Sequence, residues 1–275
     1  MTATACGPRC VGRDDVVRHV GRVRYAWRLT ALAAVLLLTP LLGRLAVLCG
    51  QRGAHRLLRL WARSLVTAAG ISVRVRGSLP RSGPALLVSN HVTFFDGMAI
   101  TARFPGLLVV TNQSAARNPL SGRLFRGAGL IFVDRDALRA TPRMVEEVTG
   151  ALRGGRVVLV YPRGTFSCRP PGGAFPPAVL QAALDAGAPV RPLLTRCVTR
   201  GSGPTARGSY FPDDESLVAM FRRVLRIRDL EIEISVLEAV DPSVCADRRE
   251  LARLTKARID EAAGTGPASC GTAGG

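Results

Sequence analysis

Short apolar runs alternate with longer helical stretches between residues 71 and 262, and this alternation constrains the fold more than any other feature. Strands that alternate with helices indicate an α/β fold, because parallel strands need crossover connections that are usually helical. We therefore predict a mainly parallel sheet flanked by helices. The predicted strands are Ile71–Val75, Ala85–Val88, Leu107–Val110, Leu130–Val133, Val157–Tyr161, Val190–Leu194 and Glu231–Val236, with helices near 97–103, 119–127, 137–152, 176–187, 214–226 and 247–262.

Polar or glycine-rich turns follow four of these strands. Three of the turns begin at Ser89, Asp134 and Pro162, and the fourth follows the strand that starts at Val190. In open α/β sheets, ligands bind beyond the carboxyl ends of the strands. The four turns are therefore expected to converge on one site.

The first of these turns contains His91, one of three histidines in the chain, and Asp96 follows it five residues later. The Asp96 carboxylate can reach back across the turn and accept a hydrogen bond from one imidazole nitrogen. The other nitrogen is then an acceptor that can take a proton from a hydroxyl, so the pair can act as a general base without a serine nucleophile. An isolated pair with this spacing more often caps a helix or fills a loop, and the other turns decide between the two interpretations.

The N-terminal part of the chain contains an apolar stretch from Leu29 to Cys49, interrupted by Pro40 and Arg44. A bilayer span needs roughly 20 apolar residues, so this stretch is a marginal span. A secretory signal is disfavoured, because the apolar region starts late and no small-residue cleavage site is obvious. Two interpretations stay open: a single transmembrane helix, and a monotopic anchor kinked at Pro40 and seated in one leaflet. For the spanning helix, upstream arginines would hold the N-terminus inside; they are Arg18, Arg22, Arg24 and Arg28.

Residues 51–66 have the pattern of an amphipathic helix with a basic face. Apolar residues recur at 54, 57, 58, 61 and 65, and arginines occupy 52, 56, 59 and 63, largely on the other face. A basic face beside a tryptophan suits an anionic membrane surface. The same pattern suits a helix that packs on the domain core, and the two interpretations are equally supported. His55 on this helix is expected to be structural.

The formal net charge is +18, and Lys256 is the only lysine, so nearly all of the positive charge is arginine. This field favours anionic partners, which include anionic lipids and thioester-bound or phosphorylated small molecules. Nucleic acid is disfavoured, because the arginines are spread along the chain and no helix-turn-helix, zinc or RNA-binding motif is present. The seven cysteines are scattered and odd in number, which indicates reduced thiols in a cytosol-facing protein. Serine-hydrolase, P-loop and dinucleotide motifs are also absent from the sequence.

Taken together, four blocks over about residues 70–240 resemble the lysophospholipid acyltransferase superfamily, especially the bacterial 1-acyl-sn-glycerol-3-phosphate acyltransferases. The first block is the H-x4-D pair His91 and Asp96. The second, an apolar strand that ends in arginine, matches 129–135. The third, Phe-Pro-Glu-Gly-Thr-Arg-Ser in the family, matches 161–167, and the fourth, an apolar strand with a proline, matches 190–193.

The resemblance implies transfer of a fatty acyl group from acyl-CoA or acyl carrier protein to a lysophosphatidate-like acceptor at a membrane. His91 with Asp96 would be the base, Arg135 would bind the phosphate with Arg139 as a second contact, and a glycine-containing turn would stabilise the oxyanion. No metal or cofactor is implied beyond the acyl thioester as co-substrate. The predicted substrate-binding residues are Asn90, Arg135, Arg139, Arg163, Gly164, Thr165 and Pro192.

The sequence departs from the family pattern in its third block. Arg163 stands where the family has glutamate, which changes the local charge by two units, and Phe166 stands where arginine or threonine is common. Thr111–Ser114 also lacks the lysine that relatives place before the second block. Two alternatives therefore stay open: an acyltransferase with a different acceptor, and a weakened or lipid-binding member of the fold. Retention of His91 and Asp96 argues against a disabled site.

These assignments divide the chain into four parts. Residues 1–22 are expected to form a disordered basic tail, and residues 23–69 are expected to form membrane-associating helices. Residues 70–262 are assigned to the acyltransferase domain, and residues 263–275 to a second disordered tail. The expected location is the cytoplasmic face of the cell membrane.

Overall fold

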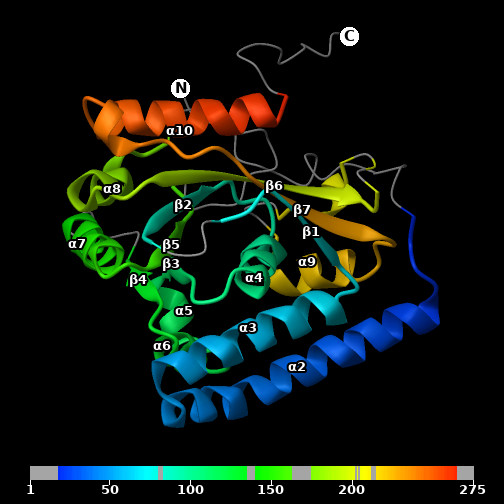
Figure 1. Ribbon diagram of the computed structural model, residues 1–275. Coiled ribbons are helices and arrows are strands. Elements are labelled where there is room, and N and C mark those ends of the chain that lie inside the picture. Colours follow the sequence, from blue (N-terminus) through cyan, green and yellow to red (C-terminus); the bar gives the residue numbers. More distant parts are fainter. Residues whose placement is uncertain are drawn as a thin grey trace.

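Seven strands form one sheet that lies between two layers of helices in the computed structural model of the chain (Figure 1). The structure describes residues 18–79, 83–134, 140–162, 175–201, 203, 205–211 and 215–264. The strand order is β1-β7-β6-β2-β5-β3-β4. The strands are β1 Ser72–Arg76, β2 Ala85–Ser89, β3 Leu108–Asn112, β4 Ile131–Val133, β5 Val157–Val160, β6 Val190–Thr199 and β7 Leu230–Val236.

All neighbouring strands are parallel except β6 and β7, which are antiparallel. The prediction of a mainly parallel α/β sheet is therefore confirmed, and each predicted strand overlaps an observed one. The predicted end of the sixth strand at Leu194 is wrong, because β6 continues to Thr199. Its second half pairs with β7, from Leu193 opposite Val236 to Thr199 opposite Leu230. This pairing provides hydrogen-bond partners for the backbone N–H and C=O groups of the added residues.

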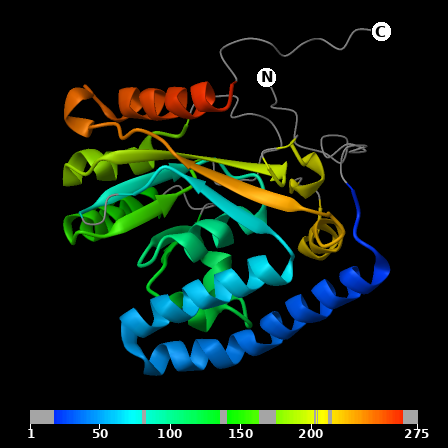
Figure 2. The same ribbon diagram turned by 45° about the vertical axis from the view of Figure 1, so that its right-hand side comes forward.

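Two layers of helices bury the two faces of the sheet (Figures 1 and 2). One layer packs with the Leu87 and Leu159 side of the sheet, and the other with the Leu86 and Val158 side. The first contains α2 Arg22–Leu48, α3 Gly50–Ala68, α4 Phe94–Arg103, α5 Gln113–Arg117, α6 Gly122–Gly127 and α9 Leu217–Val224, and the second contains α7 Ala140–Arg153, α8 Gln181–Ala186 and α10 Arg248–Ala262.

The helices agree in place with the predicted ones, with differences at the ends. The predicted helix over 176–187 is a 3₁₀ turn, Ala178–Leu180, followed by the short α8, and the short α5 was not predicted. Two further 3₁₀ turns are Arg207–Ser209 and Pro242–Val244. The helix after β2 begins at Phe94 rather than near residue 97.

α3 packs its apolar face on the domain, which decides between the two interpretations of residues 51–66. The buried residues of α3 are Ala54, Leu58, Trp61, Ala62, Leu65 and Val66, and its arginines at 52, 56, 59 and 63 are exposed. The Trp61 indole Nε1 donates a 2.8 Å hydrogen bond to the Thr39 hydroxyl of α2. The amphipathic pattern thus reflects core packing, and Trp61 is not available to a membrane surface.

α2 has one face on the domain and one apolar face exposed. It passes through Pro40 as one helix, and Gly43 lies so close to α6 that a Cβ would sit 3.0 Å from Cβ of Arg123. The exposed large apolar residues of α2 are Val23, Trp27, Leu29, Leu37, Leu38, Leu41, Leu45, Val47 and Leu48. By its length and composition α2 could cross a membrane. The mean hydropathy of an 18-residue window in α2 is 2.2, and 22% of that window is buried.

Arg28 was expected to be one of the arginines that hold the N-terminus inside. It is instead 5% exposed, and its guanidinium donates hydrogen bonds to the carbonyl groups of Leu225, Ile227 and Gly70. A buried cation is tolerated here because three carbonyl oxygens accept its protons. Arg28 therefore ties the start of α2 to the domain.

The expectation of disorder up to residue 22 is wrong at its C-terminal end. The Val20 amide donates a 2.8 Å hydrogen bond to the carbonyl of Arg226, and the Arg228 amide donates one of 2.7 Å to the carbonyl of Arg18. α2 then begins at Arg22. Residues 1–17 and 265–275, the remainder of the two predicted tails, lie outside the described residues.

Candidate active site

His91 lies in the turn that joins β2 to α4, beyond the carboxyl end of a central strand. Its Nδ1 is 2.7 Å from Oδ1 of Asp96. Because a carboxylate only accepts hydrogen bonds, Nδ1 carries the proton and Nε2 is the acceptor. The structure therefore places the predicted pair in the geometry that a general base requires.

Asp96 is fully buried and is held by backbone donors as well as by His91. Its Oδ2 accepts hydrogen bonds from the amides of Val92, at 2.8 Å, and Thr93, at 3.1 Å. Asp96 is in the first turn of α4, where free amide groups and the helix dipole favour a negative charge. The carboxylate thus caps α4 and orients His91, so the capping interpretation is confirmed for Asp96 and its catalytic role stays a prediction.

Asn90 connects the turn to β6. Its amide nitrogen donates a 2.9 Å hydrogen bond to the carbonyl of Thr195, and its amide oxygen accepts one of 2.8 Å from the Thr195 amide. Ser89 adds a 3.3 Å contact between its hydroxyl and that of Thr195. These bonds give Asn90 a role in positioning the turn, and a substrate contact by Asn90 stays a prediction.

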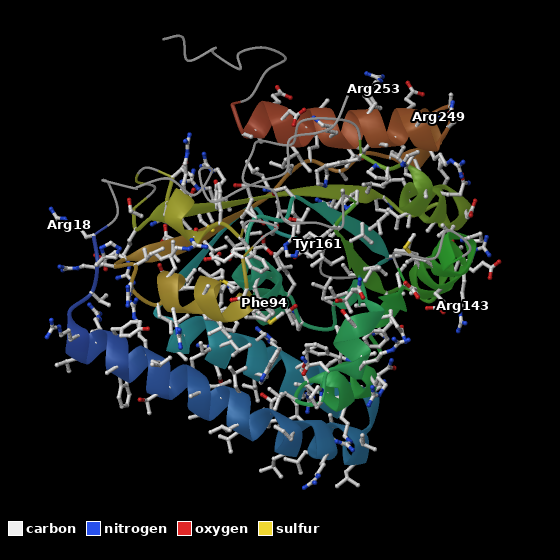
Figure 3. All side chains as sticks on the ribbon, turned by 180° about the vertical axis from the view of Figure 1, so that it is seen from behind. Arg18, Phe94, Arg143, Tyr161, Arg249 and Arg253 are labelled. Carbon is white, nitrogen blue, oxygen red and sulfur yellow. The ribbon has the colours of Figure 1, made fainter. Side chains whose placement is uncertain are left out.

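Tyr161 follows β5 directly and lies against His91. The two rings are stacked, with centroids 4.0 Å apart and an interplanar angle of 19°. Tyr161 lies near the middle of the molecule, whereas Arg249 and Arg253 on α10 point outward (Figure 3). Burial, and then the negative charge of Asp96, raise the pKa of Tyr161 well above its usual range. Tyr161 is not among the predicted site residues, and the available signal was a tyrosine where the family block begins with phenylalanine.

Aromatic packing fixes the start of α4. The Phe221 ring on α9 lies 5.5 Å from the rings of both Phe94 and Phe95, and Phe95 is fully buried. The Phe211 amide donates a 3.0 Å hydrogen bond to the carbonyl of Val92, in the same turn as His91. The turn is therefore held from β6, from α9 and from the segment before α9.

Five predicted site residues, Arg135, Arg139, Arg163, Gly164 and Thr165, lie outside the described residues. The strands that precede them are described: β4 ends at Val133 and β5 at Val160, and both point to the same edge of the sheet as β2. β5 is adjacent to β2, whereas β4 is three strands away, about 14 Å at the usual strand spacing.

Pro192 lies inside β6, opposite Val88 of β2, and is buried. Its carbonyl accepts a 3.0 Å hydrogen bond from the Leu237 amide. Because β6 extends seven residues beyond Pro192, the expected turn directly after this part of the strand does not exist. A substrate contact by Pro192 stays a prediction, and its observed place is in the interior of the sheet.

Comparisons with known proteins identify the family. Residues 71–196 match the model of the family described as Acyltransferase. The chain is 33% identical over 202 residues to a lyso-ornithine lipid O-acyltransferase of Pseudomonas aeruginosa, covering 72% of this chain and 75% of the relative. It is 28% identical over 200 residues to a 1-acyl-sn-glycerol-3-phosphate acyltransferase of Neisseria meningitidis, covering 72% and 76%.

A solved structure shares the fold. The 1-acyl-sn-glycerophosphate acyltransferase PlsC of Thermotoga maritima superposes with a TM-score of 0.66 at 17% identity, covering 90% of this chain and 99% of that one. The match includes the mixed sheet flanked by helices and extends over most of both chains. With the His91–Asp96 pair, the family match and the relatives in view, the chain belongs to the acyltransferase family and is an acyltransferase of the lysophospholipid type, which functions in phospholipid biosynthesis.

Proposed function

We propose that the protein is a membrane-associated O-acyltransferase that moves a fatty acyl group from acyl-CoA or acyl carrier protein to a hydroxyl of a lysolipid acceptor. The observation that carries this proposal is the 2.7 Å contact between His91 Nδ1 and Asp96 Oδ1. It leaves Nε2 as a proton acceptor on a side chain that is 16% exposed, beside a carboxylate that is buried. A base with this arrangement suits removal of a proton from an alcohol.

The reaction needs two proton transfers. The acceptor hydroxyl oxygen attacks the thioester carbonyl carbon while His91 Nε2 takes the hydroxyl proton. The carbon–sulfur bond then breaks, and the thiolate takes the proton from Nε2, so that an ester and a free thiol leave. The oxyanion formed between these steps needs hydrogen-bond donors, and we assign this role to the backbone amides of Gly164 and Thr165.

The exposed apolar face of α2 supports a membrane location. The exposed apolar face of α2 includes Trp27, Leu37 and Leu41, and such a face is typical of a helix that lies in the interface. Because Arg28 and Thr39 hold the other face against the domain, we propose a monotopic helix in one leaflet rather than a span. Exposed arginines lie at the start of α2, and on this basis we propose that the domain is on the cytoplasmic face.

The acceptor is the open part of the proposal. A lysophosphatidate-like acceptor would use Arg135 and Arg139 as phosphate ligands. Two considerations favour testing a second acceptor, lyso-ornithine lipid: Arg163 replaces the glutamate of the family block, and relatives in Pseudomonas aeruginosa and Rhizobium meliloti, 33% and 31% identical to this chain, carry that name. An acyltransferase with either acceptor keeps the same base.

An acyl-transfer assay tests the proposal. Membranes that contain the protein are given labelled oleoyl-CoA or oleoyl–acyl carrier protein with either lysophosphatidate or lyso-ornithine lipid, and His91→Ala is the control. Product that depends on His91 supports the transferase, and the acceptor that is used identifies the substrate. Failure of both acceptors and of a wider lysolipid panel would favour the lipid-binding alternative. Arg135→Ala is expected to raise the acceptor KM, and an unchanged KM would remove Arg135 from phosphate binding.

A further inference from the structure

Tyr161 contacts the proposed base through its ring, and nothing in the reaction above uses it. The stack with His91 is nearly parallel, at 19°, with centroids 4.0 Å apart. The hydrogen bond to Asp96 fixes the position of Nδ1. The stacked tyrosine ring limits the tilt of the imidazole plane. Together the two contacts define the plane in which Nε2 presents its lone pair.

The Tyr161 hydroxyl lies in a confined place beside α4. It is buried and has no hydrogen-bond partner of normal geometry among the described residues. A Cβ on Gly97, the residue after Asp96, would lie 3.3 Å from its oxygen, so the glycine leaves room for the hydroxyl. Burial, and then the negative charge of the Asp96 carboxylate, raise the pKa of Tyr161. The phenol therefore keeps its proton throughout the neutral range and faces a carboxylate.

We propose that Tyr161 is a positioning residue for His91: its ring, stacked on the imidazole, holds the plane in which Nε2 faces the acceptor hydroxyl. This inference rests on the proposed function, because it takes His91 as the base. It separates two parts of one side chain, and the ring and the hydroxyl can be removed one at a time.

Tyr161→Phe removes only the hydroxyl. We expect its kcat to stay close to the wild-type value, because the ring and its stack on His91 remain. Tyr25→Phe on α2 is the matched control, since Tyr25 contacts Arg226.

Tyr161→Leu removes the ring as well. We expect kcat to fall by about 10-fold or more with little change in the acceptor KM, because the imidazole loses its fixed plane. Phenylalanine, which restores the ring, should recover most of this loss. Equal kcat values for the leucine and phenylalanine variants, with an active wild type, overturn the role of the ring. If the wild-type protein transfers no acyl group with any acceptor, the proposed function fails instead.

Discussion

The buried carboxylate of Asp96 lies 2.7 Å from Nδ1 of the partly exposed His91, and this single contact joins the end of a helix to the end of a strand. Oδ1 accepts a hydrogen bond from the His91 imidazole, and Oδ2 accepts hydrogen bonds from the amides of Val92 and Thr93, which precede α4. The use of one carboxylate by both the imidazole and the amides before α4 explains the spacing of the H-x4-D pair. Four intervening residues are the length needed for the first turn of a helix to return its side chain to the preceding strand end.

His91→Ala should lower kcat by about 10²-fold or more, because the acceptor hydroxyl loses its base. The steady-state rate of acyl transfer measures the effect. His19→Ala is the matched control, since His19 is exposed and lies in the bridge to Ile227. Turnover near the wild-type value in the His91 variant would exclude His91 as the base.

Asp96→Asn should lower both activity and stability. The asparagine side chain has one oxygen acceptor in place of two, and its NH₂ group only donates. It cannot accept from His91 and from the amides of Val92 and Thr93 together, so at least one buried donor loses its partner. An unsatisfied buried group costs about 1–3 kcal/mol, and the imidazole loses its fixed tautomer. Urea denaturation and the acyl-transfer rate report the two losses separately. A variant with wild-type stability would contradict the capping role of Asp96.

Two charges on the outer face of α2 should release the protein from vesicles without unfolding it. Leu37 and Leu41 are 77% and 52% exposed, so Leu37→Glu with Leu41→Glu costs little in the fold and opposes insertion into a leaflet. Flotation with vesicles of anionic phospholipid measures binding, and circular dichroism checks the fold. Ser64→Glu, at an exposed position of α3, is the control. Removal of residues 1–69 is a poorer test, because it would uncover the core beneath α3.

Arg28→Met should destabilise the protein, since the carbonyls of Leu225 and Ile227 lose their buried donor. The loss is about 1–3 kcal/mol in the free energy of unfolding. Arg24→Met, at an exposed position one turn earlier in α2, should have little effect. Equal stability of the two variants in urea would show that Arg28 does not hold α2 on the domain.

His55 should make stability depend on pH. Its Nε2 is 3.1 Å from Nη2 of Arg156, and burial, opposed by the Gln51 carbonyl and helped by Arg156, lowers its pKa below 6.5. The unfolded chain therefore takes up the proton first as the pH falls through 6.5, and stability present above that value is lost. The difference in unfolding free energy between wild type and His55→Gln should shrink from pH 8 to pH 5. A difference that stays constant would remove His55 as the cause.

Parts of the site could be predicted from local patterns. The pairing of His91 with Asp96 depends on a short turn between a strand and a helix, and both elements are visible in the sequence. Tyr161, by contrast, is 70 residues away along the chain, and it meets His91 because β5 pairs with β2. The Asn90 contact with Thr195 likewise depends on the pairing of β2 with β6.

The amino-acid sequence by itself determined the α/β class, the order of strands and helices along the chain and the His91–Asp96 pair, because each depends on local periodicity or on a turn of fixed length. Only the tertiary structure decided which arginine is buried, which face of α2 is left uncovered and which aromatic ring lies on His91. Arg28 and Trp61 have the same local pattern as residues at a membrane surface. Their burial depends on carbonyl and hydroxyl groups that other elements bring to them, and such long-range partners leave no trace in local spacing.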